Sequence, residues 1–309
     1  MLVKRYNSAS DFFKGLFGQR VQKISIDAGF TCPNRDGKRG YGGCTYCLNT
    51  TFTPFYIKRT KTIGEQLDEG IDFFAKKYKS WKYLAYFQAY TNTYATLSVL
   101  KSKYEEALCH KGVIGLVIAT RPDAVDEQIL DYLAYLNEKY FVLIEYGIES
   151  TINRTLQRIN RGHSFEESIK AIELTAKYNL LQTAHLILGL PGESKEEMLL
   201  HAKRISQLPI NILKLHQLQI IRHTEMEKEF AEKSEDFHLF GVEEYVDFVV
   251  DFLEILHPSI IIDRFINEAP KSMVLAPNWG GLKNFEIVHK IEQQLEKRNT
   301  WQGRKYKNF

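Results

Sequence analysis

Residues 181–207 read LQTAHLILGLPGESKEEMLLHAKRISQ and contain one complete strand–turn–helix unit. The first eight residues are mostly apolar and predict a buried strand, and the Gly-Leu-Pro-Gly that follows predicts a tight turn. The remainder is amphipathic, and Ser194 followed by Glu196 and Glu197 is typical of a helix N-terminus with acidic residues in its first turn. This stretch therefore predicts a β-strand that leads directly into an α-helix.

The same unit recurs along the chain, because apolar runs rich in β-branched and aromatic residues alternate with amphipathic stretches. The predicted strands are residues 21–28, 84–90, 113–120, 141–148, 181–188, 212–221 and 260–265, and the predicted helices are residues 62–79, 126–138, 165–179, 194–207 and 284–297. Alternation of this kind gives parallel strands joined by right-handed crossovers. We therefore expect an α/β fold, with six or seven units in a full or partial βα-barrel rather than an open doubly wound sheet.

Polar and glycine-containing segments lie at or after the ends of six consecutive predicted strands. They are residues 27–30, 88–93, 120–123, 147–150, 189–193 and 214–219. Because the carboxyl ends of parallel strands gather at one mouth of a βα-barrel, side chains from all these segments meet there. The sequence therefore predicts an active site at this mouth.

Composition excludes several classes of protein. The chain has 309 residues, of which 44% are hydrophobic and 26% charged, as in ordinary globular domains and unlike disordered or collagen-like chains. No run of ~18 apolar residues is present to span a membrane, and the first residues lack the apolar core of a signal peptide. We therefore expect a cytoplasmic protein with no membrane partner.

Basic residues are concentrated at the two ends of the chain. Residues 1–61 contain 11 Lys or Arg against 3 Asp or Glu, whereas the remainder contains 30 against 35. The C-terminal end carries a basic tail formed by Lys297, Arg298, Arg304, Lys305 and Lys307. Basic ends around an acidic middle are typical of a surface that contacts a phosphate backbone, and solvated surface charge with a frayed terminus is the alternative explanation.

Three of the four cysteines lie close together in the segment CPNRDGKRGYGGCTYC, as Cys32, Cys44 and Cys47. Four glycines between the first two allow the backbone to turn tightly around a bulky inorganic group. Three hypotheses stay open. A zinc site lacks a nearby fourth ligand, a redox C-x2-C pair leaves Cys32 unused, and a [4Fe–4S] cluster on three thiolates leaves one iron open for an exogenous ligand. The distant Cys109 is predicted to be a small buried apolar residue.

With these cysteines, the chain resembles the radical S-adenosylmethionine (SAM) superfamily. Its C-x11-C-x2-C spacing departs from the commoner C-x3-C-x2-C and is similar to that of the YtqA/YhcC-like (MnmL-type) bacterial family, which is related to the elongator catalytic subunit. An ordered set of motifs between about residue 20 and about residue 280 strengthens the resemblance. They are YFQAYTNTY at residues 86–94, ATRPD at 119–123, EYGIES at 145–150, NRGH at 160–163 and GLPGE at 189–193.

The resemblance implies a fold and two cofactors. Residues 1–223 are expected to form a partial (β/α)6-type, TIM-barrel-like radical SAM barrel with a cluster loop at residues 29–48. Residues 224–309 are expected to form a helical C-terminal extension that packs on the barrel and ends in the basic tail. Cys32, Cys44 and Cys47 would hold a [4Fe–4S] cluster. SAM would bind its open iron and, with an electron from a donor such as flavodoxin or ferredoxin, would yield methionine and a 5′-deoxyadenosyl radical.

The resemblance also assigns residues to SAM. Tyr46 would border the adenine, and Arg161 would pair with the SAM carboxylate. Because Ala119 stands where relatives often carry a ribose-binding glutamate, the ribose is assigned to Glu149. His185 matches a polar position that contacts SAM. The SAM amino group is assigned to the segment that replaces the family's glycine-rich stretch, which consists of Gln88, Ala89, Tyr90 and Thr91.

Each of these side chains also has a purely structural interpretation. Tyr46 and His185 are of types that often pack in a core, Glu149 could cap a helix, and Arg161 could form a surface ion pair. The groups expected to face the substrate are Lys214, His216, Asp263 and Arg264, each of which could instead form a salt bridge or a core contact. No residue is assigned as the one that returns a hydrogen to the product.

Within the family, the resemblance implies a tRNA substrate. The expected reaction converts 5-carboxymethylaminomethyl uridine at the wobble position to the 5-aminomethyl form, a step in the synthesis of 5-methylaminomethyl-2-thiouridine, with a separate methyltransferase as a partner. Two alternatives stay open: a radical SAM enzyme that acts on a small molecule or a protein, and a metal-stabilised RNA-binding protein without enzymatic activity. Polar groups at the barrel mouth favour an enzyme, and the basic ends favour a nucleic-acid substrate.

Overall fold

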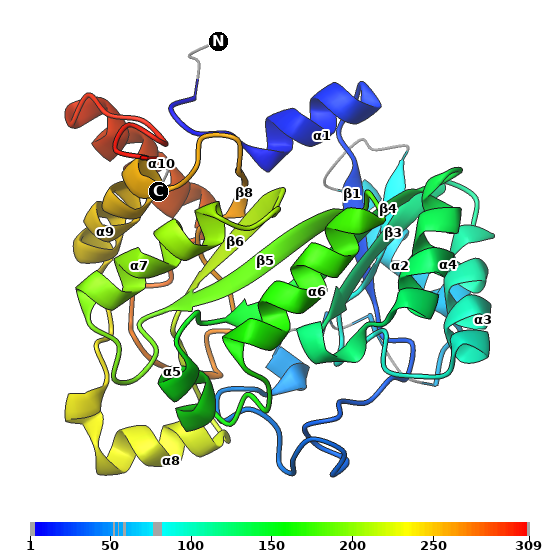
Figure 1. Cartoon of the computed structure of the whole chain (residues 1–309), viewed down its shortest axis with the longest axis horizontal. Coiled ribbons are helices and arrows are strands. Elements are labelled where there is room, and N and C mark those ends of the chain that lie inside the picture. The colour runs from blue at the N-terminus through cyan, green and yellow to red at the C-terminus, as the bar shows by residue number, and fades with distance from the viewer. Residues whose placement is uncertain (1–3, 52, 55, 58–59, 77–81, 308–309) are drawn as a thin grey trace.

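The computed structural model describes residues 4–51, 53–54, 56–57, 60–76 and 82–307. Its centre is a curled sheet of seven parallel strands in the order β1-β2-β3-β4-β5-β6-β8 (Figure 1). The strands are β1 (Gln22–Ile26), β2 (Tyr83–Phe87), β3 (Val113–Thr120), β4 (Phe141–Glu149), β5 (Leu181–Leu188), β6 (Ile212–Gln217) and β8 (Ile261–Arg264). The predicted partial βα-barrel is confirmed.

Helices connect the strands and cover the outer face of the sheet (Figure 1). They are α1 (Ala9–Phe17), α2 (Ile63–Ala75), α3 (Leu97–Leu108), α4 (Glu127–Asn137), α5 (Asn153–Arg158), α6 (Phe165–Lys177), α7 (Lys195–Ser206), α8 (Glu225–Glu232), α9 (Val242–Ile255) and α10 (Asn284–Lys297). Short 3₁₀ turns lie at Asn49–Thr51, Pro122–Ala124 and Ser234–Asp236. The predicted N-cap at Ser194 is confirmed, because its hydroxyl accepts from the Glu197 amide while the Glu197 carboxylate accepts from the Ser194 amide.

The stretch predicted as one strand at residues 212–221 is instead two strands. β6 ends at Gln217, and β7 (Ile220–Ile221) pairs in the antiparallel direction with β9 (Val274–Ala276). The ladder between β5 and β6 ends at the Leu188–Gln217 pair, with a last bond from the Leu218 amide to the Leu188 carbonyl at 2.8 Å. The β7–β9 pairing brings residues 266–283 to the mouth of the barrel.

The C-terminal extension contributes to the sheet itself. β8 follows α9 in the chain and supplies the seventh strand, beside β6. Outside the sheet, α9 packs against α7 and α10. The domain boundary at residue 223 stays a prediction. Within the described residues, no helix is both long and apolar enough to cross a membrane.

Alternate residues of the strands point into the barrel and form layers along its axis. The first layer is apolar: Leu84, Val117, Leu143, Ile212 and Ile261 pack with Ala9 of α1, so α1 closes the amino end of the barrel. Two residues further along the strands, most of the inward side chains are polar. These polar groups therefore lie between the closed amino end of the barrel and its mouth.

Candidate active site

Above the apolar layer lies a layer of buried charged residues. Glu145 is fully buried, accepts from Lys214 Nζ at 2.6 Å and from the Tyr86 hydroxyl at 2.7 Å, and pairs with Lys23 Nζ at 3.1 Å. Burial opposes ionisation of Glu145, but Lys214 and Lys23 outweigh it and hold its pKa well below the usual range. Asp263 bridges the same two lysines at 3.2 and 3.3 Å. Since Lys23 and Asp263 lie on β1 and β8, this ion pair also joins the two outermost strands of the curled sheet.

Two of the four predicted substrate-facing residues belong to this layer rather than to the cavity. Lys214 is 1% exposed, and burial lowers its pKa to about 8 despite the neighbouring carboxylates. Lys214 and Asp263 are absent from the lining of the cavity described below, whereas His216 and Arg264 are part of it. Lys214 and Asp263 are instead engaged in the ion pairs of the charged layer.

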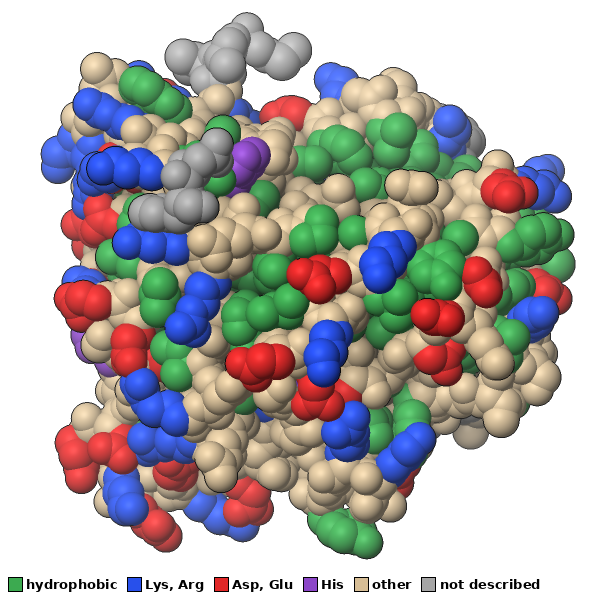
Figure 2. All heavy atoms as spheres, in the orientation of Figure 1, with side chains coloured by type: hydrophobic (Ala, Val, Ile, Leu, Met, Phe, Trp, Pro, Cys, Tyr) green, Lys and Arg blue, Asp and Glu red, His purple; other side chains and the backbone are tan. Residues whose placement is uncertain are grey.

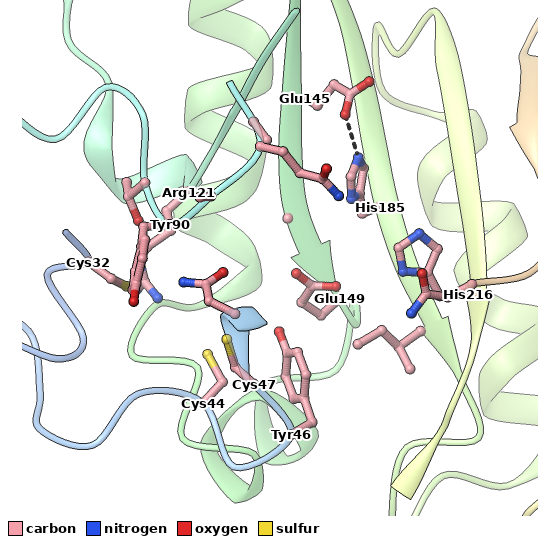
Figure 3. Close-up of a pocket in the computed structure, with 18 of the residues that line it drawn as sticks. Cys32, Cys44, Tyr46, Cys47, Tyr90, Arg121, Glu145, Glu149, His185 and His216 are labelled. Carbon is pink, nitrogen blue, oxygen red and sulfur yellow. Dashed lines mark hydrogen bonds and ion pairs between the residues drawn. The ribbon is translucent and has the colours of Figure 1, made fainter. Parts of the chain in front are cut away.

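Directly above the charged layer, a cavity of about 210 Å³ opens at the carboxyl ends of the strands. The three cysteines of the 29–48 loop lie at one end, His185 and His216 lie at the other, and Tyr46 and Glu149 lie between them (Figure 3). The lining also contains Gln88, Ala89, Tyr90 and Thr91 after β2 and Arg161 after α5. Every residue predicted to bind SAM therefore lines one cavity, together with Cys32, Cys44 and Cys47.

Several hydrogen bonds hold the cysteine loop in place. Asn160 Nδ2 donates to the Gly43 carbonyl at 2.8 Å, and the Arg35 guanidinium donates to the Cys47 carbonyl at 2.9 Å. Asn34 Nδ2 lies 3.7 Å from Cys44 Sγ, and Arg161 Nη1 lies 3.5 Å from the same sulfur. Burial, reinforced by Cys44, raises the pKa of Cys47 to about 11. Positive groups around the loop therefore favour the thiolate forms that burial disfavours.

In the described part of the chain, no three His, Cys, Asp or Glu side chains are close enough together to hold one metal ion. The three cysteines nevertheless line the same cavity.

Cys109 differs from the prediction. It is exposed and follows the last turn of α3, so it is not a buried apolar residue.

Arg161 and Glu149 form a buried pair beside the cysteines. Arg161 is 6% exposed, its Nη2 donates to the Gly147 carbonyl at 2.5 Å and lies 3.7 Å from Glu149, and its Nε has no partner among the described residues. This burial excludes the surface-pair interpretation. Glu149 has a φ of +72° and does not cap α5, whose N-cap is Ile152. Burial raises the pKa of Glu149, and Arg161 counteracts this effect.

The histidine end of the cavity holds two buried imidazoles, those of His185 and His216. His185 Nε2 lies 3.3 Å from Glu145, and its ring centre lies 5.4 Å from that of His216. Burial, reinforced by Lys214, lowers the pKa of His185 to about 4, and burial also lowers that of His216 well below its usual value. His216 Nε2 has no partner within the described chain. Both histidines line the cavity, so neither is enclosed in the apolar core.

Arg121 and Asn267 are among the cavity residues to which the sequence assigned no individual role. Arg121 forms two hydrogen bonds with Asp123, at 2.8 and 2.9 Å, and leaves a buried Nη1 without a partner among the described residues. The Thr-Arg-Pro-Asp sequence after the third strand, with charges two residues apart, was the available signal. Asn267, the other, follows β8 in a segment with no recognisable pattern.

Several of the basic residues near the chain ends are neutralised. Arg39 pairs with Asp123 at 3.3 Å and with Glu167 at 3.0 Å, and Arg298 pairs with Asp247 and Asp251 of α9. The tail is packed rather than frayed, since the Lys305 amide also donates to the Glu254 carbonyl. Lys58 and Arg59 lie outside the described residues. On the face with α6 and α7, acidic and basic side chains are interspersed (Figure 2).

The chain is similar to known proteins over most of its length. The Radical SAM superfamily matches residues 32–205, and the Radical_SAM C-terminal domain matches residues 210–297. YtqA of Bacillus subtilis (strain 168) is 35% identical over 301 residues, which cover 97% of this chain and 92% of YtqA. A tRNA uridine(34) acetyltransferase of Methanocaldococcus infernus is 26% identical over 199 residues, which cover 63% of this chain and 35% of that protein.

A solved structure agrees with the fold. The archaeal Elp3 of Methanocaldococcus infernus, with its N-terminus deleted, superposes with a TM-score of 0.66 at 18% identity. The match covers 91% of this chain and 64% of that one, so the chain spans less than two thirds of the Elp3 chain. The fold, the match over residues 32–205 and the identity with YtqA agree. The chain therefore belongs to the radical SAM superfamily.

Proposed function

We propose that this radical SAM enzyme modifies the wobble uridine of tRNA, converting a 5-carboxymethylaminomethyl group to the 5-aminomethyl form. The observation that carries the enzymatic part is the single cavity that Cys32, Cys44 and Cys47 share with Arg161 and Glu149. The RNA part is supported by the similarity to a protein named tRNA uridine(34) acetyltransferase. It is also supported by free basic groups near the mouth, described in the next subsection.

Radical SAM enzymes use a [4Fe–4S] cluster and SAM, and the residues of this cavity fit both. Three buried or half-buried cysteines beside guanidinium groups match the charge of a thiolate-bound cluster. The unpartnered buried donors of Arg161 and Arg121 match an anionic group such as the SAM carboxylate. We propose that the cysteines hold the cluster, that Arg161 binds the SAM carboxylate and that Glu149 binds the ribose hydroxyls.

When bound, the two cofactors supply a one-electron route for removing hydrogen from an unactivated C–H bond. The chain's own residues orient the reactants and exclude water. The apolar layer and α1 close the cavity from below, and the charged layer is satisfied internally by the Glu145–Lys214 pair. His216 is neutral at pH 7, so its unpartnered Nε2 is able to form a hydrogen bond with a group on the substrate side of the cavity.

The test is to reconstitute the protein anaerobically and to incubate it with SAM, a reductant and tRNA that carries the 5-carboxymethylaminomethyl group. We expect SAM cleavage to depend on this tRNA, and digestion of the product to release 5-aminomethyl uridine. Cleavage of SAM with no change in the tRNA nucleosides would favour the small-molecule or protein substrate. Stoichiometric zinc without iron after reconstitution would refute the mechanism.

A further inference from the structure

A second cavity adjoins the first on the side away from the cysteines. It has a volume of about 680 Å³ and is lined largely by residues 266–283. Gln217, Gln219 and Asn267 line both cavities, so the two spaces meet at the carboxyl end of β6. A group held in the second cavity would therefore lie next to the histidine end of the first.

Hydrogen bonds and ring packing hold the walls of the second cavity in place. Gln217 and Asn267 exchange two hydrogen bonds, from Gln217 Nε2 to the Asn267 carbonyl at 3.1 Å and from the Asn267 amide to Gln217 Oε1 at 2.9 Å. The Trp279 indole donates to the Phe240 carbonyl at 2.8 Å, and its ring centre lies 5.2 Å from that of Tyr245. A fixed aromatic ring thus forms part of the lining, next to the β7–β9 pair.

Basic groups around these walls are free of carboxylates. In the described part of the chain, neither Lys271 nor Lys283 of the second cavity has a carboxylate within 4.0 Å, and the same is true of Arg264 of the first cavity. Lys271 Nζ lies over the Gly280–Gly281 turn, where a Cβ on Gly281 would come within 2.1 Å of it. Glu268, the acidic residue of the lining, is engaged with the Asn284 amide. These free cations contrast with the paired Arg39, Arg298 and Lys305 elsewhere.

We propose that the second cavity is the subsite for the phosphate-bearing RNA segment next to the reacting nucleoside. Lys271 and Lys283 bind phosphate oxygens, and Trp279 offers a ring on which a splayed base stacks. Arg264 lines the cysteine cavity, three residues before the shared Asn267, and faces the reacting nucleoside. This inference rests on the proposed function, because it names the surface by which the proposed tRNA substrate is held.

The experiment measures binding of a fluorescent RNA anticodon stem–loop to the reconstituted protein with SAM present, at several salt concentrations. The test variant is Lys271→Gln/Lys283→Gln. The control is Lys101→Gln/Lys139→Gln, whose amines lie over tyrosine rings beside α3 and α4, outside both cavities. If both test lysines contact phosphates, the slope of log affinity against log salt flattens by about 1.4, at ~0.7 per contact with single-stranded RNA. The control keeps the wild-type slope, and both variants keep wild-type SAM affinity.

The possible results distinguish failure of the proposed subsite from failure of the proposed tRNA substrate. If wild-type protein binds the RNA and the test variant shows an unchanged slope, the subsite is refuted and the tRNA substrate stands. If wild-type protein does not bind the RNA even at low salt, the tRNA substrate fails together with the subsite. Heparin serves as a polyanion without bases. If heparin binding shows the same loss in the test variant as RNA binding does, the site is a general polyanion surface and the nucleotide assignment is overturned.

Discussion

Single cysteine side chains determine whether the site can hold iron. We expect Cys32→Ala, Cys44→Ala and Cys47→Ala each to lose the cluster on anaerobic reconstitution, because three thiolates leave none to spare. Cys109→Ala is the matched control, since this exposed thiol lies at the end of α3. Iron and sulfide analysis measures the effect, with ~4 Fe and ~4 S²⁻ per chain expected for wild type and the control. Full iron content in any of the first three variants would remove that cysteine from the ligand set.

Arg161 is expected to bind SAM through its guanidinium shape as well as its charge. The group already contacts Gly147, Cys44 and Glu149, and a lysine cannot reproduce this set of donors. Arg161→Lys should weaken SAM binding by ~1–3 kcal/mol while the cluster survives. Calorimetric titration of SAM into the reconstituted protein measures this, and Arg154→Lys, an exposed arginine paired with Glu197, is the control. Equal SAM affinities in the two variants would exclude Arg161 from the SAM site.

The buried imidazole of His185 makes stability depend on pH. Burial lowers its pKa from 6.5 to about 4, so between these values the unfolded chain binds a proton that the folded chain does not. Neutral His185 contributes fully to the free energy of unfolding above pH 6.5. This contribution falls as the pH decreases toward 4, by about 2 kcal/mol between pH 7 and pH 5. His185→Gln should flatten the pH dependence of urea unfolding by this amount, and His289→Gln on the surface should not. Parallel pH curves for wild type and His185→Gln would contradict the expectation.

The turn from β4 into α5 fixes the position of Glu149. Ser150 donates to Glu193 at 2.5 Å, Glu193 pairs with His201 at 3.1 Å, and the other nitrogen of His201 bonds Thr151 at 2.7 Å. All four side chains are buried, so this relay ties the turn to α7. The left-handed backbone of Glu149, with φ of +72°, is held by these contacts rather than by its own preference.

A methyl group on β4 should test this placement. A Cβ at Gly147 would come within 2.5 Å of Glu149 Oε1 and 2.7 Å of Arg161 Nη2, so Gly147→Ala pushes both side chains aside. We expect SAM affinity to fall about tenfold, or ~1.4 kcal/mol, with the cluster retained. The control is Gly15→Ala in α1, where the methyl group meets no atom within 4 Å and should stabilise the helix by up to ~1 kcal/mol. Unchanged SAM affinity in Gly147→Ala would show that the Glu149–Arg161 pair does not bind SAM.

The two ends of the chain stabilise the fold together. The buried Gln302 accepts from the Asn7 amide at 2.9 Å and donates to the carbonyls of His257 and Ile260 at 2.9 and 2.8 Å. Gln302→Ala leaves these buried groups unpaired and should lower the free energy of unfolding by ~1–3 kcal/mol. Urea denaturation measures this against Gln293→Ala on the exposed face of α10. Equal midpoints for the two variants would show that the ends are not coupled to global unfolding.

The sequence predicted the repeated features of this fold and missed those set by distant contacts. All seven strands of the main sheet lie within predicted stretches or within one residue of them, because buried parallel strands read as apolar runs. Helix α1 was not predicted. Its apolar residues Phe12 and Phe13 pack against the end of the barrel that the helix closes, and this contact joins segments far apart in the sequence. The cysteines were found by spacing. Lys214 is enclosed because its layer lies below the cavity along the barrel axis. No local sequence pattern indicates the position of a layer along this axis.

The joined ends have a practical consequence for handling an oxygen-sensitive enzyme. Residues 4–7 and 298–307 meet beside the amino end of β8, and the cavity opens at the opposite ends of the strands (Figure 1). An anchor attached to either terminus would therefore hold the molecule with its mouth facing outward. Immobilised in this orientation on a resin or an electrode, the enzyme could be washed free of reductant, presented with RNA and regenerated without release from its support.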